Sequence, residues 1–89
     1  DLGVHTVCVK MTDEFLEFSK LKGNDLSTPK PEFGSPGLKP GNSWCLCAER
    51  WAEAYAANMA PKIFIKKTNI KTLDIIPLEI LKKHSIDLN

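Results

Sequence analysis

Alternating apolar and polar positions in the N-terminal quarter of the chain predict a strand followed by a helix. Residues 4–11 are rich in β-branched side chains, with apolar residues on both alternating sets of positions, as in a strand covered on both faces. Thr12 and the two acidic residues after it form a helix start, since threonine caps free amides and carboxylates favour the positive end of the helix dipole. Apolar residues then recur at helical spacing up to Gly23, so we expect a helix over 12–22.

The second half of the pattern predicts another helix, two short strands and a terminal helix. Residues 44–58 gather their large apolar side chains on one stripe when successive positions are rotated by about 100°. Residues 62–68 alternate as a strand does, and a further short strand is expected over 73–76. Pro77 suits the first turn of a helix over 77–84. The predicted fold is therefore α+β, a small sheet covered by helices.

Residues 23–43 carry no periodic pattern and form the longest connection of this predicted fold. Loops of this length in compact domains are usually either functional or disordered. This one holds four prolines, and its apolar side chains Leu26, Phe33 and Leu38 are spaced like anchors onto a core. We therefore expect an ordered loop, which either only completes the core or forms a binding or catalytic site.

Polar side chains of this loop and of the helix expected after it are candidates for ligand binding. In a rigid loop such side chains either hold the backbone in turns or face a ligand, and the sequence leaves both roles open. A phosphate-binding role is disfavoured, because the glycines match neither nucleotide-binding pattern. The candidate ligand-binding residues are Asn24, Asp25, Ser27, Thr28, Glu32, Trp44 and Arg50.

Three cysteines, Cys8, Cys45 and Cys47, raise the question of thiol or metal chemistry. Cys45 falls in the first turn of the expected helix, where the helix dipole stabilises a thiolate, so it is the candidate catalytic residue; a cysteine packed under the loop is the alternative. Cys47 falls within the apolar stripe and is expected to be an inert core thiol. The C-x-C spacing separates two helical side chains by roughly 200°, so no metal site is predicted.

Charge and composition narrow the range of partners. Acidic and basic residues nearly balance at a formal net charge of +1, and no row of aromatic side chains accompanies the C-terminal lysines. We therefore expect neither nucleic acid nor membrane as a partner. The odd number of cysteines favours an intracellular, cytoplasmic location, with organellar targeting left open because the sequence does not begin with methionine.

The chain of 89 residues has room for one modest core, so we expect a single domain over 1–89. The sequence identifies no cofactor and assigns no enzymatic reaction. The leading hypothesis is a small binding or accessory module that contacts a small molecule or another protein through the loop over 24–42. A thiol-dependent enzyme or redox protein using Cys45 is the alternative, and a subunit of a larger assembly is a further one.

The run GNDLSTPKPEFGSPGLKPG, followed by WCLCAERW, closely resembles a mainly bacterial family catalogued as domain of unknown function 2237. HTVC near the start and IPLEILKKH near the end extend the resemblance over nearly the whole chain. The resemblance implies a soluble α+β domain and no established activity, substrate or cofactor. Family members typically have an aromatic residue and a carboxylate where this chain has Ser35 and Asn42. They also usually carry an upstream segment with further cysteines, which we expect to be missing here.

Overall fold

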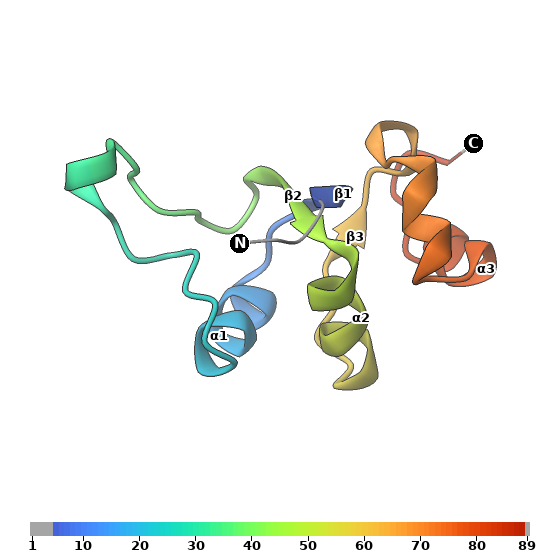
Figure 1. The fold of residues 1–89 in the computed structure, drawn as a ribbon, viewed down its shortest axis with the longest axis horizontal. Helices are drawn as coiled ribbons and strands as arrows, with labels where there is room; N and C mark the ends of the chain where they lie inside the picture. The colour runs from blue at the N-terminus through green and yellow to red at the C-terminus, as the bar shows by residue number, and fades with distance from the viewer. Residues whose placement is uncertain (1–4, 89) are drawn as a thin grey trace.

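The computed structural model describes residues 5–88 and arranges them as a small antiparallel sheet with two helices on one face (Figure 1). The helices and strands in chain order are β1 His5–Lys10, α1 Asp13–Leu21, β2 Ser43–Cys47, α2 Ala48–Ala56, β3 Lys62–Ile63 and α3 Leu78–Lys83. Short 3-10 helices occupy Pro31–Phe33, Ile65–Lys67 and Ile70–Asp74. The strand order β2-β1-β3 puts β1 in the centre of the sheet. The predicted α+β class is confirmed.

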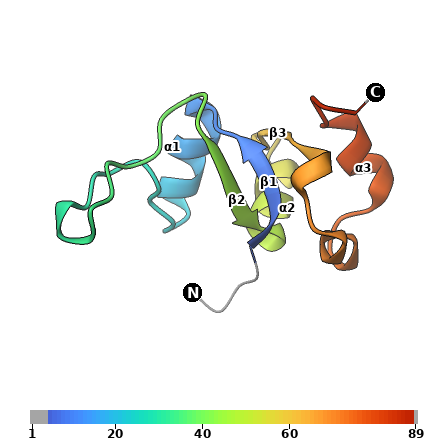
Figure 2. The same ribbon diagram turned by 90° about the horizontal axis from the view of Figure 1, so that it is seen from above.

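The core lies between the sheet and helices α1 and α2, which Figure 2 shows behind the strands. Val7 and Val9 of β1, Phe15 of α1 and Trp51 of α2 are each at most 1% exposed. Burial of these aromatic and branched side chains supplies the main driving force for folding. The indole N–H of Trp51 donates to the carbonyl of Pro61 at 3.0 Å, so the largest core side chain keeps its polar atom satisfied.

The opposite face of the sheet is covered only in part. Near β3, the buried hydroxyl of Thr72 donates to the hydroxyl of Thr6 at 2.8 Å and holds the 3-10 helix Ile70–Asp74 against the sheet. Near β2, Cys8 and Cys45 lie directly opposite each other and form a disulfide bond. On the outer face, the 3-10 helix Ile70–Asp74 thus covers the β3 side, and a disulfide joins β1 to β2 on the other side.

The first two predicted elements are confirmed by their local signals. The amide of Phe15 donates to Thr12 Oγ1 at 3.1 Å, so Thr12 caps α1 as expected. Gly23 follows the helix with a φ of 88°, a left-handed conformation that suits glycine. The strand expected over 4–11 is β1; Val4 lies outside the described residues.

The helix expected over 44–58 is wrong in its first turn. Ser43–Cys47 form the strand β2, and the helix α2 begins only at Ala48. The apolar spacing of this segment is compatible with a helix, but pairing with β1 decides its conformation. Tertiary pairing of this kind routinely outweighs local helix preference.

Both strands expected after α2 are also corrected. The strand predicted over 62–68 ends at Ile63, because the next turn coils into a 3-10 helix whose Ile65 and Lys66 amides donate to the Asp87 carboxylate at 2.7 and 3.1 Å. Of the strand predicted over 73–76, Leu73 and Asp74 lie in the 3-10 helix Ile70–Asp74, and Ile75 and Ile76 form a turn after it. Asn69 caps this helix, because its Oδ1 accepts from the amide of Lys71 at 2.8 Å.

The helix predicted over 77–84 is confirmed as α3. Pro77 is its N-cap residue rather than its first helical residue, so the helix begins one position later than expected. In Figure 1, α3 lies beyond β3, on the opposite side of the sheet from the long loop.

Candidate functional site

The connection between α1 and β2 is an ordered loop. Its two arms, residues 25–30 and 35–38, are hydrogen-bonded to each other. The backbones of Lys30 and Ser35 exchange hydrogen bonds of 2.8 and 3.1 Å, and the amide of Leu38 donates to the carbonyl of Leu26 at 2.8 Å. The 3-10 turn Pro31–Phe33 forms the tip, which Figure 1 shows projecting away from the sheet. The predicted ordered loop is confirmed.

Of the expected apolar anchors, Leu26 and Leu38 pack against the core. Phe33 does not; it is 79% exposed in the tip turn. Its predicted role as an anchor is wrong. Phe33 lies in the short turn between the paired residues Lys30 and Ser35, and this turn projects into solvent.

Asp25 organises the first arm of the loop. One carboxylate oxygen accepts the amides of Ser27 and Thr28, each at 3.1 Å, and the other accepts the Thr28 hydroxyl. The hydrogen bond from the Thr28 hydroxyl, followed by those from the Thr28 and Ser27 amides, outweighs desolvation and lowers the pKa of Asp25 to about 2. Asp25 is therefore ionised at neutral pH, and its oxygens hold the loop.

Gly37 lies where the second arm touches the first. Its φ is 82°, and a Cβ added there would lie 2.2 Å from the carbonyl oxygen of Ser27. Glycine meets both demands, because it adopts left-handed φ values and brings no side chain into the contact. The close approach of Gly37 to Ser27 therefore fixes the two arms side by side.

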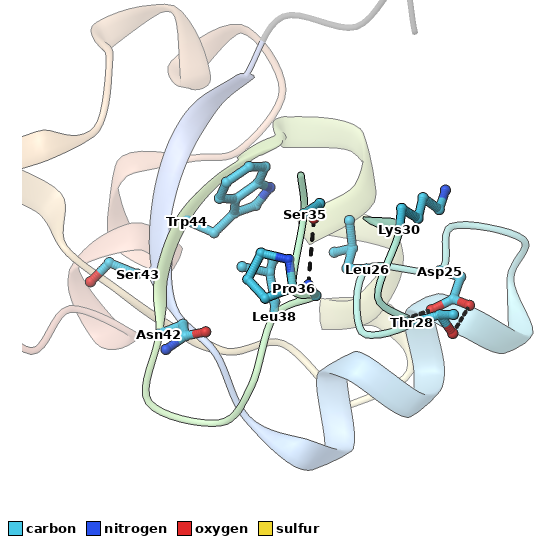
Figure 3. Close-up of a pocket in the computed structure, with 11 residues that line it drawn as sticks. Asp25, Leu26, Thr28, Lys30, Ser35, Pro36, Leu38, Asn42, Ser43 and Trp44 are labelled. Carbon is cyan, nitrogen blue, oxygen red and sulfur yellow. Dashed lines mark hydrogen bonds between the residues drawn. The ribbon is translucent and has the colours of Figure 1, made fainter. Parts of the chain in front are cut away.

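The folded loop and the start of β2 border an open hollow of about 520 Å³, a size typical of small-molecule sites (Figure 3). Its wall is apolar where the loop faces the tryptophan of β2, at Leu26, Pro36, Leu38 and Trp44. The polar part of the lining consists of Asp25, Thr28, Lys30, Ser35, Asn42 and Ser43.

A smaller hollow of about 90 Å³ lies farther along β2. It is bordered by His5 of β1, by Asn24 and Arg50 and by the strand residues 44–47, and it shares Leu26 and Trp44 with the larger hollow. The two hollows therefore border successive residues of β2 and the residue before it, from Asn42 to Cys47. We call them together the edge groove.

Five of the seven predicted ligand-binding residues line the edge groove: Asn24, Asp25, Thr28, Trp44 and Arg50. Ser27 lies outside the lining and donates its amide and hydroxyl to Asp25. Glu32 is exposed in the tip turn, also outside the lining. The structure thus brings most of the candidates to one groove and leaves these two in structural or solvent-facing positions.

Several lining residues were not among the predicted site residues, notably Lys30, Ser35 and Asn42. A signal for the first two was present: Pro31 and Gly34 are typical turn residues, and a turn between them places Lys30 opposite Ser35. Asn42 Oδ1 accepts from the amide of Lys39 at 2.9 Å. The side chain of Asn42 thus holds the backbone at Lys39.

Arg50 marks the α2 end of the edge groove. Its Nη1 lies 3.4 Å from the carbonyl oxygen of Lys22 and 3.4 Å from Oε1 of Glu53. Both charged side chains are partly exposed, so this ion pair contributes little to stability. Its consequence for the groove is that a carboxylate already accompanies the guanidinium.

Cys45 does not lie at a helix N-terminus, and its thiol is not free. It occupies β2 and forms a disulfide with Cys8, 37 residues earlier in the chain. The predicted helical environment is therefore corrected, and any nucleophilic role of Cys45 would first require reduction of this bond. Cys47 is a buried thiol, as expected for a core cysteine.

The disulfide borders another shallow hollow of about 430 Å³ on the outer face of the sheet. His5, Trp44, Phe64 and Lys67 complete most of its wall. The ammonium group of Lys67 lies 5.1 Å from the centre of the Phe64 ring, within the range of cation–π contacts. This hollow shares Trp44 with both parts of the edge groove, Ser43 with the larger part, and His5 and Cys45 with the smaller part.

Within residues 5–88, no group of three or more His, Cys, Asp or Glu side chains is placed to hold a metal ion, and no helix is long and apolar enough to cross a membrane. No curated protein matches the sequence. The profile of a family described as uncharacterized protein conserved in bacteria, DUF2237, matches residues 1–85. The resemblance seen in the loop and in the WCLCAERW run is thereby confirmed. This chain belongs to the DUF2237 family of uncharacterized bacterial proteins.

Proposed function

We propose that the protein is a binding module whose small-molecule ligand or protein partner occupies the edge groove. The observation that carries this proposal is that contacts within the chain itself hold the loop wall of the groove in place. The Asp25 hydrogen bonds and the Gly37–Ser27 contact hold the loop in place beside β2. A preformed wall lowers the conformational entropy lost on binding, which favours affinity.

The lining indicates what kind of group would bind. Trp44, Pro36 and Leu38 supply an apolar wall for a flat or aliphatic group. The larger hollow has one ammonium group, on Lys30, and one carboxylate, on Asp25, so its charges balance. Recognition would therefore depend on apolar contact and on uncharged hydrogen-bonding groups more than on ligand charge.

A nuclear magnetic resonance titration tests the proposed function. The probes are two sets of small aromatic compounds, primary amides and carboxylic acids, added to ¹⁵N-labelled protein. We expect amide shifts over residues 24–28 and 35–44 together with the Trp44 indole. Trp44→Ala should weaken binding about tenfold or more, which corresponds to about 1.4 kcal/mol.

Phe33→Ala is the matched control, because Phe33 is an exposed aromatic residue outside the groove lining. This variant should bind within about twofold of the wild type, since interface effects concentrate in a few well-packed residues. Equal losses in both variants, or shifts confined to surfaces away from the groove, would contradict the proposed function.

A redox role using Cys45 is the second candidate, favoured by the Cys8–Cys45 disulfide beside the outer hollow. In this reaction one thiolate of an external dithiol attacks a sulfur of the bond and releases the other as a thiolate. The second thiol of the dithiol then closes its own disulfide, so two electrons pass to the protein. Reduction of the folded protein by dithiothreitol should then be as fast as reduction of the urea-unfolded chain. Far slower reduction of the folded protein would identify a purely structural bond.

The intracellular location expected from the cysteine count stays a prediction. The cytosol keeps most thiols reduced. Alkylation of thiols in intact cells, followed by mass spectrometry of Cys8 and Cys45, tests it directly. Two alkylated thiols are the result expected in the cytosol, whereas an intact disulfide would indicate an oxidising compartment.

A further inference from the structure

We infer that the edge groove takes an extended peptide segment of another polypeptide, which pairs with the outer edge of β2 as an additional strand. This inference rests on the proposed function and deepens it by naming the class of partner. Three features carry it: the position of β2 in the sheet, the direction of its backbone groups, and the space beside it.

The first feature is that β2 is an edge strand. Within residues 5–88, β2 pairs on one side with β1 and has no strand on its other side. An edge strand presents unpaired backbone N–H and C=O groups, which can pair with a strand from another chain. Recognition by strand addition uses such an edge.

The second feature is the orientation of the backbone at Cys45. On β1, the amide of Cys8 donates to Thr68 Oγ1 at 3.2 Å and its carbonyl accepts from the amide of Phe64 at 2.8 Å. Both backbone groups of Cys8 therefore point toward β3, away from β2. Cys45 lies directly opposite Cys8 and cannot exchange backbone hydrogen bonds with it, so its own N–H and C=O point to the outer edge.

The same alternation applies to Ser43, two residues before Cys45 in the strand. Ser43 lies opposite Lys10, which pairs on its other side with Lys62 of β3. Trp44, between them, faces β1 with its backbone groups, as the antiparallel pattern requires. Ser43 and Cys45 together thus offer two amide donors and two carbonyl acceptors to a strand lying in the groove.

The third feature is open space in the direction of these groups. Ser43 borders the larger hollow and Cys45 borders the smaller one, with Trp44 and Leu26 common to both. The groove therefore runs along the strand at the level of its outward backbone groups. On its far side the loop wall carries Pro36 and Leu38, which suit an apolar side chain of the incoming segment (Figure 3).

The charges favour a peptide over a strongly charged ligand. Lys30 and Asp25 balance each other in the larger hollow, and Glu53 accompanies Arg50 at the end of the smaller one. Peptide groups are uncharged and match unpaired backbone donors and acceptors. The chemistry of the groove is therefore that of a peptide main chain with alternating apolar side chains.

The position of the loop favours a peptide over a second copy of this chain as the occupant of the groove. Pairing of two β2 edges would require both edges to be open, but in each copy the arms over 25–30 and 35–38 stand beside that edge. A single strand fits between the loop and β2 more readily than another folded sheet. We therefore assign the groove to an extended segment.

The test uses capped hexapeptides in which valine, leucine or phenylalanine alternates with threonine. Hydrogen exchange of the full chain is followed by nuclear magnetic resonance, with and without peptide. We expect exchange of the Ser43 and Cys45 amides to slow at least about tenfold on binding, because each gains a partner. The Trp44 amide, which already faces β1, should change little.

Single N-methylation of the bound peptide adds an independent readout. Each methyl group removes one N–H, and in a strand only every second residue faces a given neighbour. Affinity should therefore fall about tenfold or more at alternate positions and less than about twofold between them. Loss at every position, or at none, would overturn strand addition.

Ser43→Pro and Ser43→Ala are the matched variants. Proline removes the outward amide without taking a hydrogen bond from the β1–β2 ladder, as is tolerated on edge strands, whereas alanine keeps that amide. We expect Ser43→Pro to weaken peptide binding about tenfold more than Ser43→Ala does, because only proline removes the outward amide. Should the proline variant not fold, the exchange and N-methylation results on the wild type decide the matter.

The outcomes separate this inference from the proposed function. If the aromatic probes bind the groove and the hexapeptides do not, the peptide assignment fails and the binding module stands. If neither set binds, both fail. If sedimentation shows that the protein dimerises without peptide and the Ser43 and Cys45 amides become protected as it does so, the occupant is a second copy and the peptide assignment is overturned.

Discussion

At the scale of single residues, the order of the long loop depends on Asp25 and Gly37. Asp25 accepts hydrogen bonds from Ser27 and Thr28, a local arrangement that the sequence D-L-S-T suggests. Gly37 acts through a contact with Ser27, ten positions earlier, which no local pattern reveals. The sequence thus predicts the turn chemistry of this loop but not the contact that closes it.

Replacement of Gly37 by alanine should cost more stability than replacement of Gly34. Both residues have positive φ, and a Cβ in the left-handed region costs roughly 1–2 kcal/mol. At Gly37 the Cβ also meets the Ser27 carbonyl, whereas nothing lies within 4 Å at Gly34. We therefore expect Gly37→Ala to lower the free energy of unfolding by at least about 1 kcal/mol more than Gly34→Ala, within the range of strained backbone positions. Equal losses in urea denaturation would contradict the contact.

Acid should loosen the loop through Asp25. Its pKa in the folded protein is lowered from 3.8 to about 2, so ionised Asp25 stabilises the folded loop at every pH above about 4. That stabilisation declines as the pH falls from about 4 through 2. The Asp25 carboxyl resonance and the Thr28 amide should titrate together with a midpoint near 2; a midpoint near 4 would show that the hydrogen bonds are absent. Asp25→Asn should remove the titration of the Thr28 amide.

At the scale of elements, the sequence predicts a helix or strand correctly where the residues that determine it are neighbours in the chain. The start of α1 at Thr12 and the position of Gly23 depend on neighbouring residues and were predicted. The strand β2 was not, because its partner β1 lies far earlier in the chain and its own spacing continues that of α2. The strand predicted over 62–68 was right in its first two residues, which form β3, but its early end was missed, since Asp87 holds the next turn from 21 and 22 positions away in the chain.

The link between β1 and β2 should depend on the redox state of the protein. The disulfide joins residues 37 positions apart, and cross-links of this span stabilise by roughly 2–4 kcal/mol through the entropy of the unfolded chain. Reduction with dithiothreitol should therefore lower the urea midpoint of the wild type. A double variant with Cys8→Ser and Cys45→Ser should unfold at that lower midpoint with or without dithiothreitol. A wild-type midpoint insensitive to complete reduction would contradict a stabilising bond.

At the scale of the whole molecule, Trp51 connects the parts that surround the core. Its indole donates to Pro61 at 3.0 Å, and its ring lies 5.6 Å from that of Tyr55 and 5.0 Å from that of His84. Trp51 lies on the apolar stripe predicted for residues 44–58, and it is completely buried in the core. The contacts with Pro61 and His84 could not be predicted, because they bring the end of α3 and the entry to β3 against α2.

Trp51→Phe should be strongly destabilising although it keeps an aromatic ring. It leaves the Pro61 carbonyl without its buried donor, which costs about 1–3 kcal/mol, and it leaves part of the tryptophan volume unfilled. Tyr55→Phe is the control, because its ring is partly exposed and the change should stay within about 0.5 kcal/mol. Comparable urea midpoints for the two variants would contradict the role given to Trp51.

The candidate site combines what the sequence predicted with what it missed. The polar loop residues were expected, and five of the seven candidates line the edge groove. The other wall is β2, which was expected to be helical, so an open sheet edge could not have been foreseen. The groove exists only because the long loop and an edge strand meet, and this requires the whole fold.

The central claim is that the edge groove is preformed, and ¹⁵N relaxation of the unliganded protein tests it most directly. The account expects backbone order parameters over residues 25–30 and 35–38 close to those of α1 and α2, near the value of about 0.85 found in rigid backbone. Order parameters below about 0.6 across both arms would describe a mobile tether, and they would contradict a preformed groove and the function proposed for it.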